Sequence, residues 1–86
     1  RARGLVLRER AYLRRGLEKL GLYVCPSQAN YLLFSAPAPL FQPLLERGIL
    51  IRDCANYPGL GPGWYRAAVK RHRENQALLA ALRELL

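Results

Sequence analysis

The sequence has no methionine, only two cysteines and a single histidine among its 86 residues. Cys25 and Cys54 are too few for the disulfide framework of a small secreted domain, and they lack the spacing of a metal site. No apolar run approaches the ~18–20 residues that a membrane-spanning helix requires. The basic N-terminal segment has no apolar stretch after it, so it does not read as a secretory signal. We therefore expect a cytoplasmic protein without a membrane partner.

The size and composition of the chain predict one small folded domain. A length of 86 residues suits a single domain with a thin core, and a hydrophobic content of 51% excludes disorder. Because the chain starts at Arg1 and has no methionine, we expect it to be a piece of something longer. Residues 1–86 are therefore treated as a single domain of a larger protein.

Acidic residues are also scarce: 14 Lys and Arg stand against 6 Asp and Glu, for a net charge of +8. The basic residues cluster in 1–15 and 66–73, which raises the hypothesis of a nucleic-acid partner. However, the sequence has no alternating exposed aromatic residues on a strand and no GxxG loop between helices. A basic nucleic-acid- or anion-binding module therefore stays as the alternative from another functional class. A membrane-surface helix is disfavoured, because the core needs the apolar stripe of the first helix.

Apolar residues at helical spacing predict helices over residues 1–20, 39–47 and 72–86. Gly21 and Gly48 are stop signals for the first two helices, whereas the third has no Ser, Thr, Asp or Asn to cap its start. The predicted core positions are Val6, Leu13, Leu17 and Leu20, then Leu40, Phe41, Leu44 and Leu45, then Leu78, Leu82 and Leu85 with Ala77 and Ala81.

The segments between these helices are predicted to be extended. The aromatic and apolar run over 29–34 indicates a strand buried on both faces. Two further strands, over 49–52 and 64–70, flank a loop over 53–63 that is rich in glycine and proline. This order predicts an α+β fold, a two-layer sandwich of a small, mostly antiparallel sheet with helices packed on it. We expect one sheet face or one helix side to be partly bare.

Two arginines come close together in this arrangement. If the strands over 49–52 and 64–70 form a hairpin with Arg52 opposite Trp64, then Arg52 and Arg66 lie diagonally on one face. Their backbones would be roughly 7–8 Å apart. Guanidinium groups bind carboxylate or phosphate in a bidentate manner, so the pair suggests an anion site. The simpler alternative is that each arginine pairs with a local acid such as Asp53 or faces water.

Other polar features are weaker candidates. His72 lies in a basic run with Glu74 as its only neighbouring carboxylate, so a solvated turn residue is favoured over a general base. Cys54 is expected in a loop beside Arg52, which would lower the pKa of its thiol. The glycine-rich run over 59–63 leads into a strand, whereas a phosphate-binding loop leads into a helix. Tyr57 can reach a pocket over the loop, but packing or exposure is favoured.

Several short motifs, taken in order, resemble the C-terminal domain of fold-type I pyridoxal-phosphate-dependent enzymes. They are Pro-Ser-Gln-Ala-Asn-Tyr-Leu-Leu (26–33), Gly-Ile-Leu-Ile-Arg-Asp-Cys (48–54), Asn56-Tyr57, Gly59-Leu60, Tyr-Arg-Ala-Ala-Val (65–69), Glu74-Asn75 and Leu78-Leu79. The resemblance covers essentially the whole chain and is greatest to histidinol-phosphate aminotransferases and threonine-phosphate decarboxylases. The run that starts at Arg52 looks more like the decarboxylases of cobalamin biosynthesis than the aminotransferases of histidine biosynthesis.

This resemblance implies that residues 1–86 are the C-terminal, substrate-clamping domain of a longer lyase or aminotransferase. Arg66 matches the arginine that binds the substrate α-carboxylate, or the group at that position, and Arg52 matches the one that helps to bind the phosphate. Asn30 matches the asparagine of the preceding strand. The implied partners are a small anionic amino-acid phosphate as substrate, the enzyme's own large domain and, for the full-length enzyme, a second copy in a homodimer.

The family's cofactor, pyridoxal 5'-phosphate, is bound mainly by the large domain, which this chain does not contain. Neither Lys19 nor Lys70 lies in the context of the family's Schiff-base lysine. We therefore expect this chain alone to be inactive and to bind no cofactor tightly. The run over 70–73 departs from the small or capping residues usual between the Arg66 strand and the last helix, which puts the helix cap in doubt. Decarboxylation and transamination both remain open.

Overall fold

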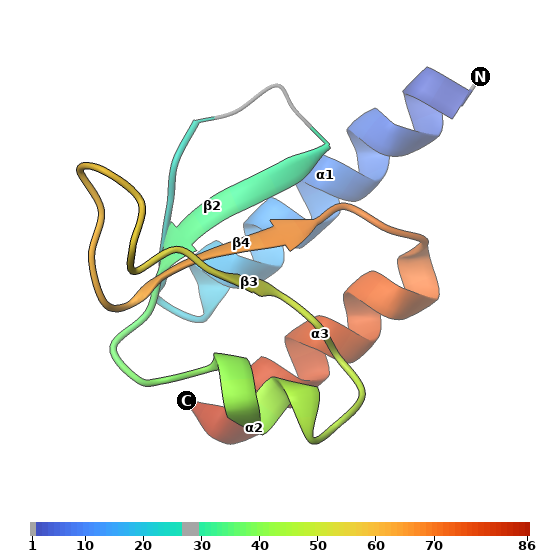
Figure 1. Cartoon of the computed structure of the whole chain (residues 1–86). Helices are drawn as coiled ribbons and strands as arrows, with labels where there is room; N and C mark the ends of the chain where they lie inside the picture. Colours follow the sequence, from blue (N-terminus) through green and yellow to red (C-terminus); the bar gives the residue numbers. More distant parts are fainter. Residues whose placement is uncertain (1, 27–29) are drawn as a thin grey trace.

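The computed structural model describes residues 2–26 and 30–86 as three helices and a four-stranded sheet (Figure 1). The elements are α1 (Ala2–Lys19), β1 (Tyr23–Val24), β2 (Tyr31–Ser35), α2 (Phe41–Leu45), β3 (Arg52–Asp53), β4 (Trp64–Ala68) and α3 (His72–Leu85). All strand pairs are antiparallel, in the order β1-β2-β4-β3. The predicted α+β fold is confirmed. Of the helices described, none is both long and apolar enough to cross a membrane.

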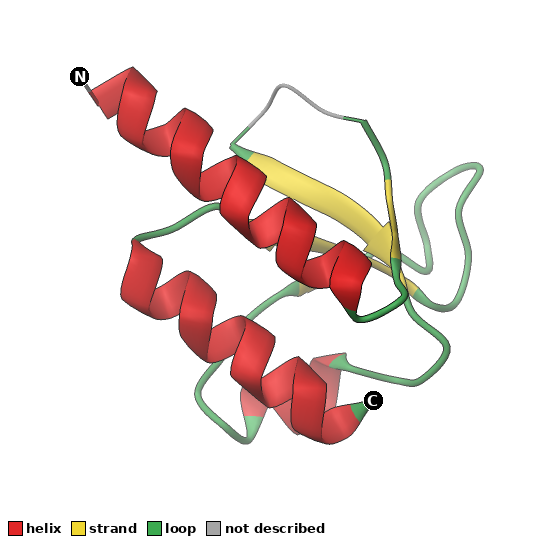
Figure 2. Ribbon diagram, turned by 180° about the vertical axis from the view of Figure 1, so that it is seen from behind, coloured by secondary structure: helices red, strands yellow, loops and turns green. Residues whose placement is uncertain are grey.

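The two long helices lie on the same side of the sheet. Figure 2 shows α1 and α3 side by side over one sheet face, and Figure 1 shows the opposite face turned away from them. The short helix α2 packs beside α3 rather than on that opposite face. Within residues 2–26 and 30–86, one face of the sheet therefore has no helix over it, and the expectation of a partly bare face is confirmed.

Burial along β2 alternates, so the prediction of a strand buried on both faces is wrong. Leu32 and Phe34 are fully buried beneath the helices, whereas Tyr31 on the other face is 39% exposed. Successive side chains of a strand point to opposite faces, and helices cover only one of them. A continuous apolar run arises here because the bare face of the sheet also carries apolar residues.

The helix-facing core contains most of the predicted positions. Leu13 and Leu17 of α1 and Leu82 of α3 are inaccessible to solvent. Two predicted positions are wrong, because Leu45 is 42% exposed and Ala77 is also exposed. In α2, five residues are too few to bury more than one side.

The buried face of α3 includes two residues that the apolar pattern did not identify, Asn75 and Leu79. Leu79 packs where α1 has Gly16, and a Cβ built on Gly16 would lie 2.4 Å from a Leu79 methyl group. The absence of a side chain at Gly16 therefore lets the two long helices approach closely.

Both predicted glycine stops close their helices in the same way. Gly21 has φ 86°, and the Leu22 N–H donates to the Leu17 carbonyl at 3.2 Å. Gly48 has φ 77°, and the Ile49 N–H donates to the Leu44 carbonyl at 2.9 Å. This is the Schellman arrangement, which needs a residue that tolerates positive φ.

The start of α3, predicted to lack a cap, is closed by two residues of its own first turn. The Arg71 N–H donates to the Glu74 carboxylate at 3.3 Å, and the Lys70 N–H donates to Asn75 Oδ1 at 3.1 Å. Carboxylates and amides in the first turn satisfy the free N–H groups there. The doubt about this cap is resolved by side chains inside the helix rather than before it.

Candidate functional site

Arg52 and Arg66 stand directly opposite each other on β3 and β4, as register partners. The prediction paired Arg52 with Trp64 and is wrong by two residues. The reason lies in the loop after β3, where the Cys54 N–H, not Arg52, pairs with the Trp64 carbonyl at 2.9 Å. Because side chains alternate with period two, a shift of two residues leaves both arginines on one face. They face each other directly rather than diagonally, and they lie on the bare face of the sheet.

A groove of about 690 Å³ opens on this face, and it contains all three residues predicted to bind substrate. We call it the arginine groove. Its lining consists of Asn30, Tyr31, Phe41, Leu50, Ile51, Arg52, Asp53, Arg66, Ala68 and Lys70. The predicted strand over 49–52 is shorter than expected, because only Arg52–Asp53 pairs with β4. Residues 50 and 51 line the groove instead of extending the sheet.

Tyr31 supports the side chain of Arg66. The Arg66 guanidinium carbon lies 4.5 Å from the centre of the Tyr31 ring. Tyr31 is paired with Ala68 and Arg66 with Leu33, so the two side chains are diagonal neighbours on one face. A cation over an aromatic ring keeps its charge while losing freedom, which suits a guanidinium that must grip a ligand in a set orientation.

No carboxylate neutralises the two groove arginines within the part of the chain that the structure describes. The ion pairs there are Arg14–Glu18, Arg47–Glu84 and His72–Glu9. Asp53 lines the groove, but its Oδ1 accepts a hydrogen bond from the Ala55 N–H at 2.9 Å. The alternative in which each arginine pairs with a local acid is therefore wrong for these residues. Arg52 is exposed and Arg66 is partly exposed, so both charges face water and are open to an anionic ligand.

Cys54 does not have the reactive character that its position beside an arginine suggested. Its side chain is completely buried, and this burial raises the pKa of the thiol. The guanidiniums of Arg66 and Arg52 oppose that rise but do not reverse it. Desolvation penalises a thiolate more than these partly solvated charges stabilise it. Tyr57, the other loop residue considered, is 37% exposed and does not line the arginine groove.

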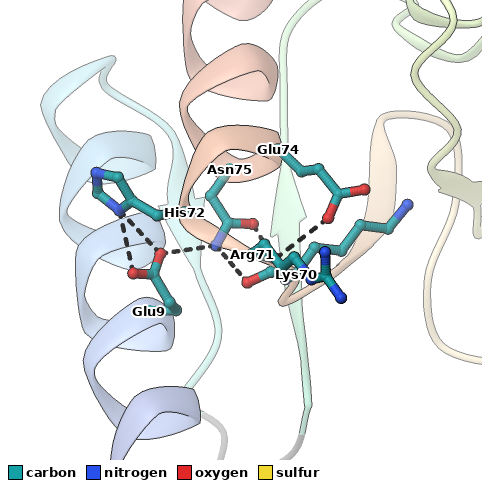
Figure 3. A network of polar contacts seen from close by, with 6 residues as sticks. All are labelled: Glu9, Lys70, Arg71, His72, Glu74 and Asn75. Atoms are coloured by element: carbon teal, nitrogen blue, oxygen red, sulfur yellow. Dashed lines mark hydrogen bonds and ion pairs between the residues drawn. The ribbon is translucent and has the colours of Figure 1, made fainter.

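A second polar cluster lies where β4 leads into α3 (Figure 3). Its centre is Asn75, 2% exposed, whose Nδ2 donates to the Glu9 carboxylate at 2.9 Å and to the Lys70 carbonyl at 2.9 Å. His72 Nδ1 donates to the same carboxylate at 3.0 Å, and the centre of its ring lies 4.5 Å from that of Tyr12, with the two ring planes tilted by 47°. A carboxylate only accepts, so the histidine nitrogen carries the proton.

Glu9 is the residue that the sequence interpretation of His72 missed. It lies 63 residues before His72, and it is 9% exposed. The hydrogen bond from Asn75 lowers the pKa of Glu9, partial burial opposes this, and His72 adds to the lowering. One signal was available: Glu9 comes three residues after Val6 and four before Leu13, so it belongs to the apolar face of α1.

Comparison with known proteins finds related sequences. The family described as Aminotransferase class I and II matches residues 2–82. Threonine-phosphate decarboxylase from Salmonella typhimurium is 48% identical over 68 residues, which cover 76% of this chain and 19% of that protein. Histidinol-phosphate aminotransferase from Anaeromyxobacter sp. is 42% identical over 90 residues, which cover 100% of this chain and 24% of that protein.

The fold has solved counterparts as well. The crystal structure of the histidinol-phosphate aminotransferase from Clostridium acetobutylicum superimposes with a TM-score of 0.87 at 30% identity. The match covers 94% of this chain and 26% of that one. The chain therefore spans about a fifth to a quarter of the length of the curated relatives it matches.

Proposed function

The chain belongs to the aminotransferase class I and II family, and from this premise we propose that it is the substrate-clamping C-terminal domain of a longer pyridoxal-phosphate-dependent enzyme. The observation that carries the proposal is the pair Arg52 and Arg66, opposite each other in an open groove without a neutralising acid among the described residues. Such a pair fits a substrate that has both a phosphate and a carboxylate, or a single phosphate dianion held by both guanidiniums. The substrate class is a small amino-acid phosphate.

Each groove residue has a proposed role. Arg66 grips the α-carboxylate or the group at that position, Arg52 binds the phosphate, and Asn30 adds a polar contact at the start of β2. Arg66 lies on a paired strand and its guanidinium rests on an aromatic ring, so its direction is set before the substrate arrives. The remote phosphate contact supplies binding energy that is used to orient the reacting carbon.

The cofactor would be held by the large domain. The cations of the groove suit the anionic groups of a substrate. Lys19, one of the two lysines of the chain, lies in the last turn of α1 and outside the groove. When bound, pyridoxal phosphate acts as an electron sink for a bond broken at the substrate Cα. What this chain would contribute is orientation: Arg66 would fix the substrate α-carboxylate, or the group at that position, and so determine which bond at Cα is presented to the cofactor.

For the specific reaction, we propose threonine-phosphate decarboxylation in cobalamin biosynthesis, with histidinol-phosphate transamination as the second candidate. Support for the first comes from the 48% identity to a threonine-phosphate decarboxylase and from the motif that starts at Arg52. Support for the second comes from the 42% identity that extends over the whole chain. We further propose a cytoplasmic homodimer for the full-length enzyme.

The test uses the full-length enzyme reconstituted with pyridoxal phosphate. Its absorbance band is followed while O-phospho-L-threonine or L-histidinol phosphate is added to wild type, Arg66→Ala, Arg52→Ala and the exposed control Arg73→Ala. Loss of a charge-assisted contact is expected to weaken binding by roughly 1.5–3 kcal/mol, about ten- to hundredfold, in the first two variants only. The substrate that shifts the band identifies the reaction.

Two results would contradict the proposal. One is the absence of a pyridoxal-phosphate band, and the other is equal substrate binding by wild type and both groove variants. In either case a steeply salt-dependent affinity for nucleic acid would bring the basic binding module forward.

A further inference from the structure

Lys70 was not predicted to take part in substrate binding, but it lines the groove together with both arginines. We propose that Lys70 is a third cation of the arginine groove that contacts the phosphate monoester of the substrate, and that Asn75, anchored by Glu9, is the positioning residue that holds it there. This inference rests on the proposed function and adds a specificity determinant to it.

The position of Lys70 follows from the way β4 continues beyond its last residue. The Val69 N–H donates to the Asn30 carbonyl at 2.7 Å, so the chain keeps its pairing with the β2 side past Ala68. Alternation along an extended chain places Arg66, Ala68 and Lys70 on the same face. Lys70 is exposed, and its side chain extends away from Glu9 and His72 (Figure 3).

A single side chain holds the backbone of Lys70 on both of its polar groups. Asn75 Oδ1 accepts from the Lys70 N–H at 3.1 Å, and Asn75 Nδ2 donates to the Lys70 carbonyl at 2.9 Å. The backbone of a residue between a strand and a helix is ordinarily free to rotate. Here a buried amide fixes it, and with it the direction in which the lysine side chain leaves the backbone.

Asn75 is itself held in place from α1. Its second Nδ2 hydrogen is donated to Glu9 Oε1 at 2.9 Å, so the carbonyl and both amide hydrogens of the side chain are used. Glu9 in turn accepts from His72 Nδ1 at 3.0 Å. The amide cannot turn over without losing these bonds, so the orientation of Lys70 depends on a contact between two helices behind the sheet.

The charges of the groove indicate what Lys70 would bind. Its lining contains three cations, Arg52, Arg66 and Lys70, and a single carboxylate, Asp53. Lys70 has no ion pair among the residues described by the structure. A phosphate monoester carries a charge of about −1.5 to −2 near pH 7, more than one guanidinium neutralises, whereas a carboxylate needs only one partner. The third cation is therefore assigned to the phosphate, together with Arg52.

The decisive measurement is titration calorimetry on the full-length protein with O-phospho-L-threonine and L-histidinol phosphate, and with L-threonine and L-histidinol as matched compounds without phosphate. Lys70→Ala is expected to weaken binding of the phosphorylated compound about five- to tenfold, and to leave binding of its unphosphorylated counterpart unchanged. Lys70→Arg restores binding to within about twofold, because it keeps the charge. The control is Arg73→Ala, an exposed cation outside the groove, and it binds like wild type.

The role of Asn75 is tested with a double-mutant cycle. Asn75→Ala, like Lys70→Ala, is expected to weaken binding of the phosphorylated compound. The double variant Asn75→Ala/Lys70→Ala should bind this compound no more weakly than Lys70→Ala alone. If Asn75→Ala does not fold, Glu9→Gln loosens the same anchor more gently and is combined with Lys70→Ala instead. Additive losses would overturn the positioning role, since a purely structural residue has no reason to act through Lys70.

The outcomes separate this inference from the proposed function. If wild type binds neither phosphorylated compound, the proposed function and the assignment of Lys70 both fail. If wild type binds and Arg66→Ala weakens binding, but Lys70→Ala matches Arg73→Ala, only the assignment of Lys70 is overturned.

Discussion

Arg52 and Arg66 are register partners on adjacent antiparallel strands, so two like charges sit opposite each other on the bare face of the sheet. Like-charged pairs in this position oppose folding. Among the described residues neither arginine has an ion pair that would offset the repulsion. An anionic ligand bound between the two arginines, as the proposed function requires, would relieve this repulsion.

Removing one charge of this pair should therefore not weaken the fold. Arg52→Gln is expected to raise the free energy of unfolding by about 0.2–1 kcal/mol, although it impairs substrate binding. Arg47→Gln is the control, because Arg47 forms an ion pair with Glu84 and its loss should lower stability by up to about 1 kcal/mol. Urea denaturation followed by Trp64 fluorescence measures both. A clear loss of stability in Arg52→Gln would show that the charges of Arg52 and Arg66 do not repel each other in the folded protein.

Close approach of α1 and α3 predicts opposite effects for two glycine substitutions in the same helix. A Cβ at Gly16 would lie 2.4 Å from a Leu79 methyl group, whereas a Cβ at Gly4 would meet nothing within 4 Å. Gly16→Ala should lower stability by about 1–2 kcal/mol through overpacking, and Gly4→Ala should raise it by up to about 1 kcal/mol through helix propensity. Urea denaturation measures both variants, and a stability change of the same sign in the two would refute the close packing of the helices.

Asn75 is expected to be among the residues most important for stability. Asn75→Ala removes three hydrogen bonds and leaves the Glu9 carboxylate and the Lys70 backbone short of partners. The expected loss is about 2–4 kcal/mol. Gln76→Ala, next to it on the exposed side of α3, should change stability by less than about 0.5 kcal/mol. Comparable effects of the two substitutions on the urea midpoint would show that the cluster is not structural.

The lowered pKa of Glu9 predicts a stability change in acid. Because its folded pKa lies below the usual value of 4.5, the ionised carboxylate stabilises the fold above that pH. The contribution is lost as the pH falls through the lower, folded value. Glu9→Gln should therefore be less stable than wild type at pH 6, and the difference should shrink below pH 4.5. Glu46→Gln, an exposed carboxylate, serves as the control whose difference from wild type should not follow this course.

The two thiols should differ in reactivity. Cys54 is fully buried and burial raises its pKa, so little thiolate is present near pH 8 and reagents reach it only after opening. Cys25 is partly exposed. With a disulfide reagent, Cys25 should react in the native state, and Cys54 should react at a rate set by unfolding. Cys25→Ser should remove the fast phase; loss of the fast phase in Cys54→Ser instead would contradict the assignment.

Much of the architecture was open to prediction because it depends on local rules. Helical spacing and the glycines at 21 and 48 set the helix ends, and a positive φ at each glycine is what closes the helix. The period of two along a strand placed Arg52 and Arg66 on one face even though the predicted register was wrong by two residues. Asn30, which the family resemblance identified rather than this period, lines the same groove as both arginines.

Other features were decided only by the tertiary structure. Which face of the β2 strand is bare depends on where α1 and α3 pack, and the bare face cannot be predicted from the apolar run alone. The register of β3 depends on the loop after it, whose backbone bonds follow no simple periodicity. The contact between Glu9 and His72 joins residues 63 apart in the chain. Sequence pattern thus determined the helices, the strands and the shared face of the two arginines, because these follow local repeats. Packing decided which sheet face is bare and which side chains pair, because distant residues meet only once the chain has folded.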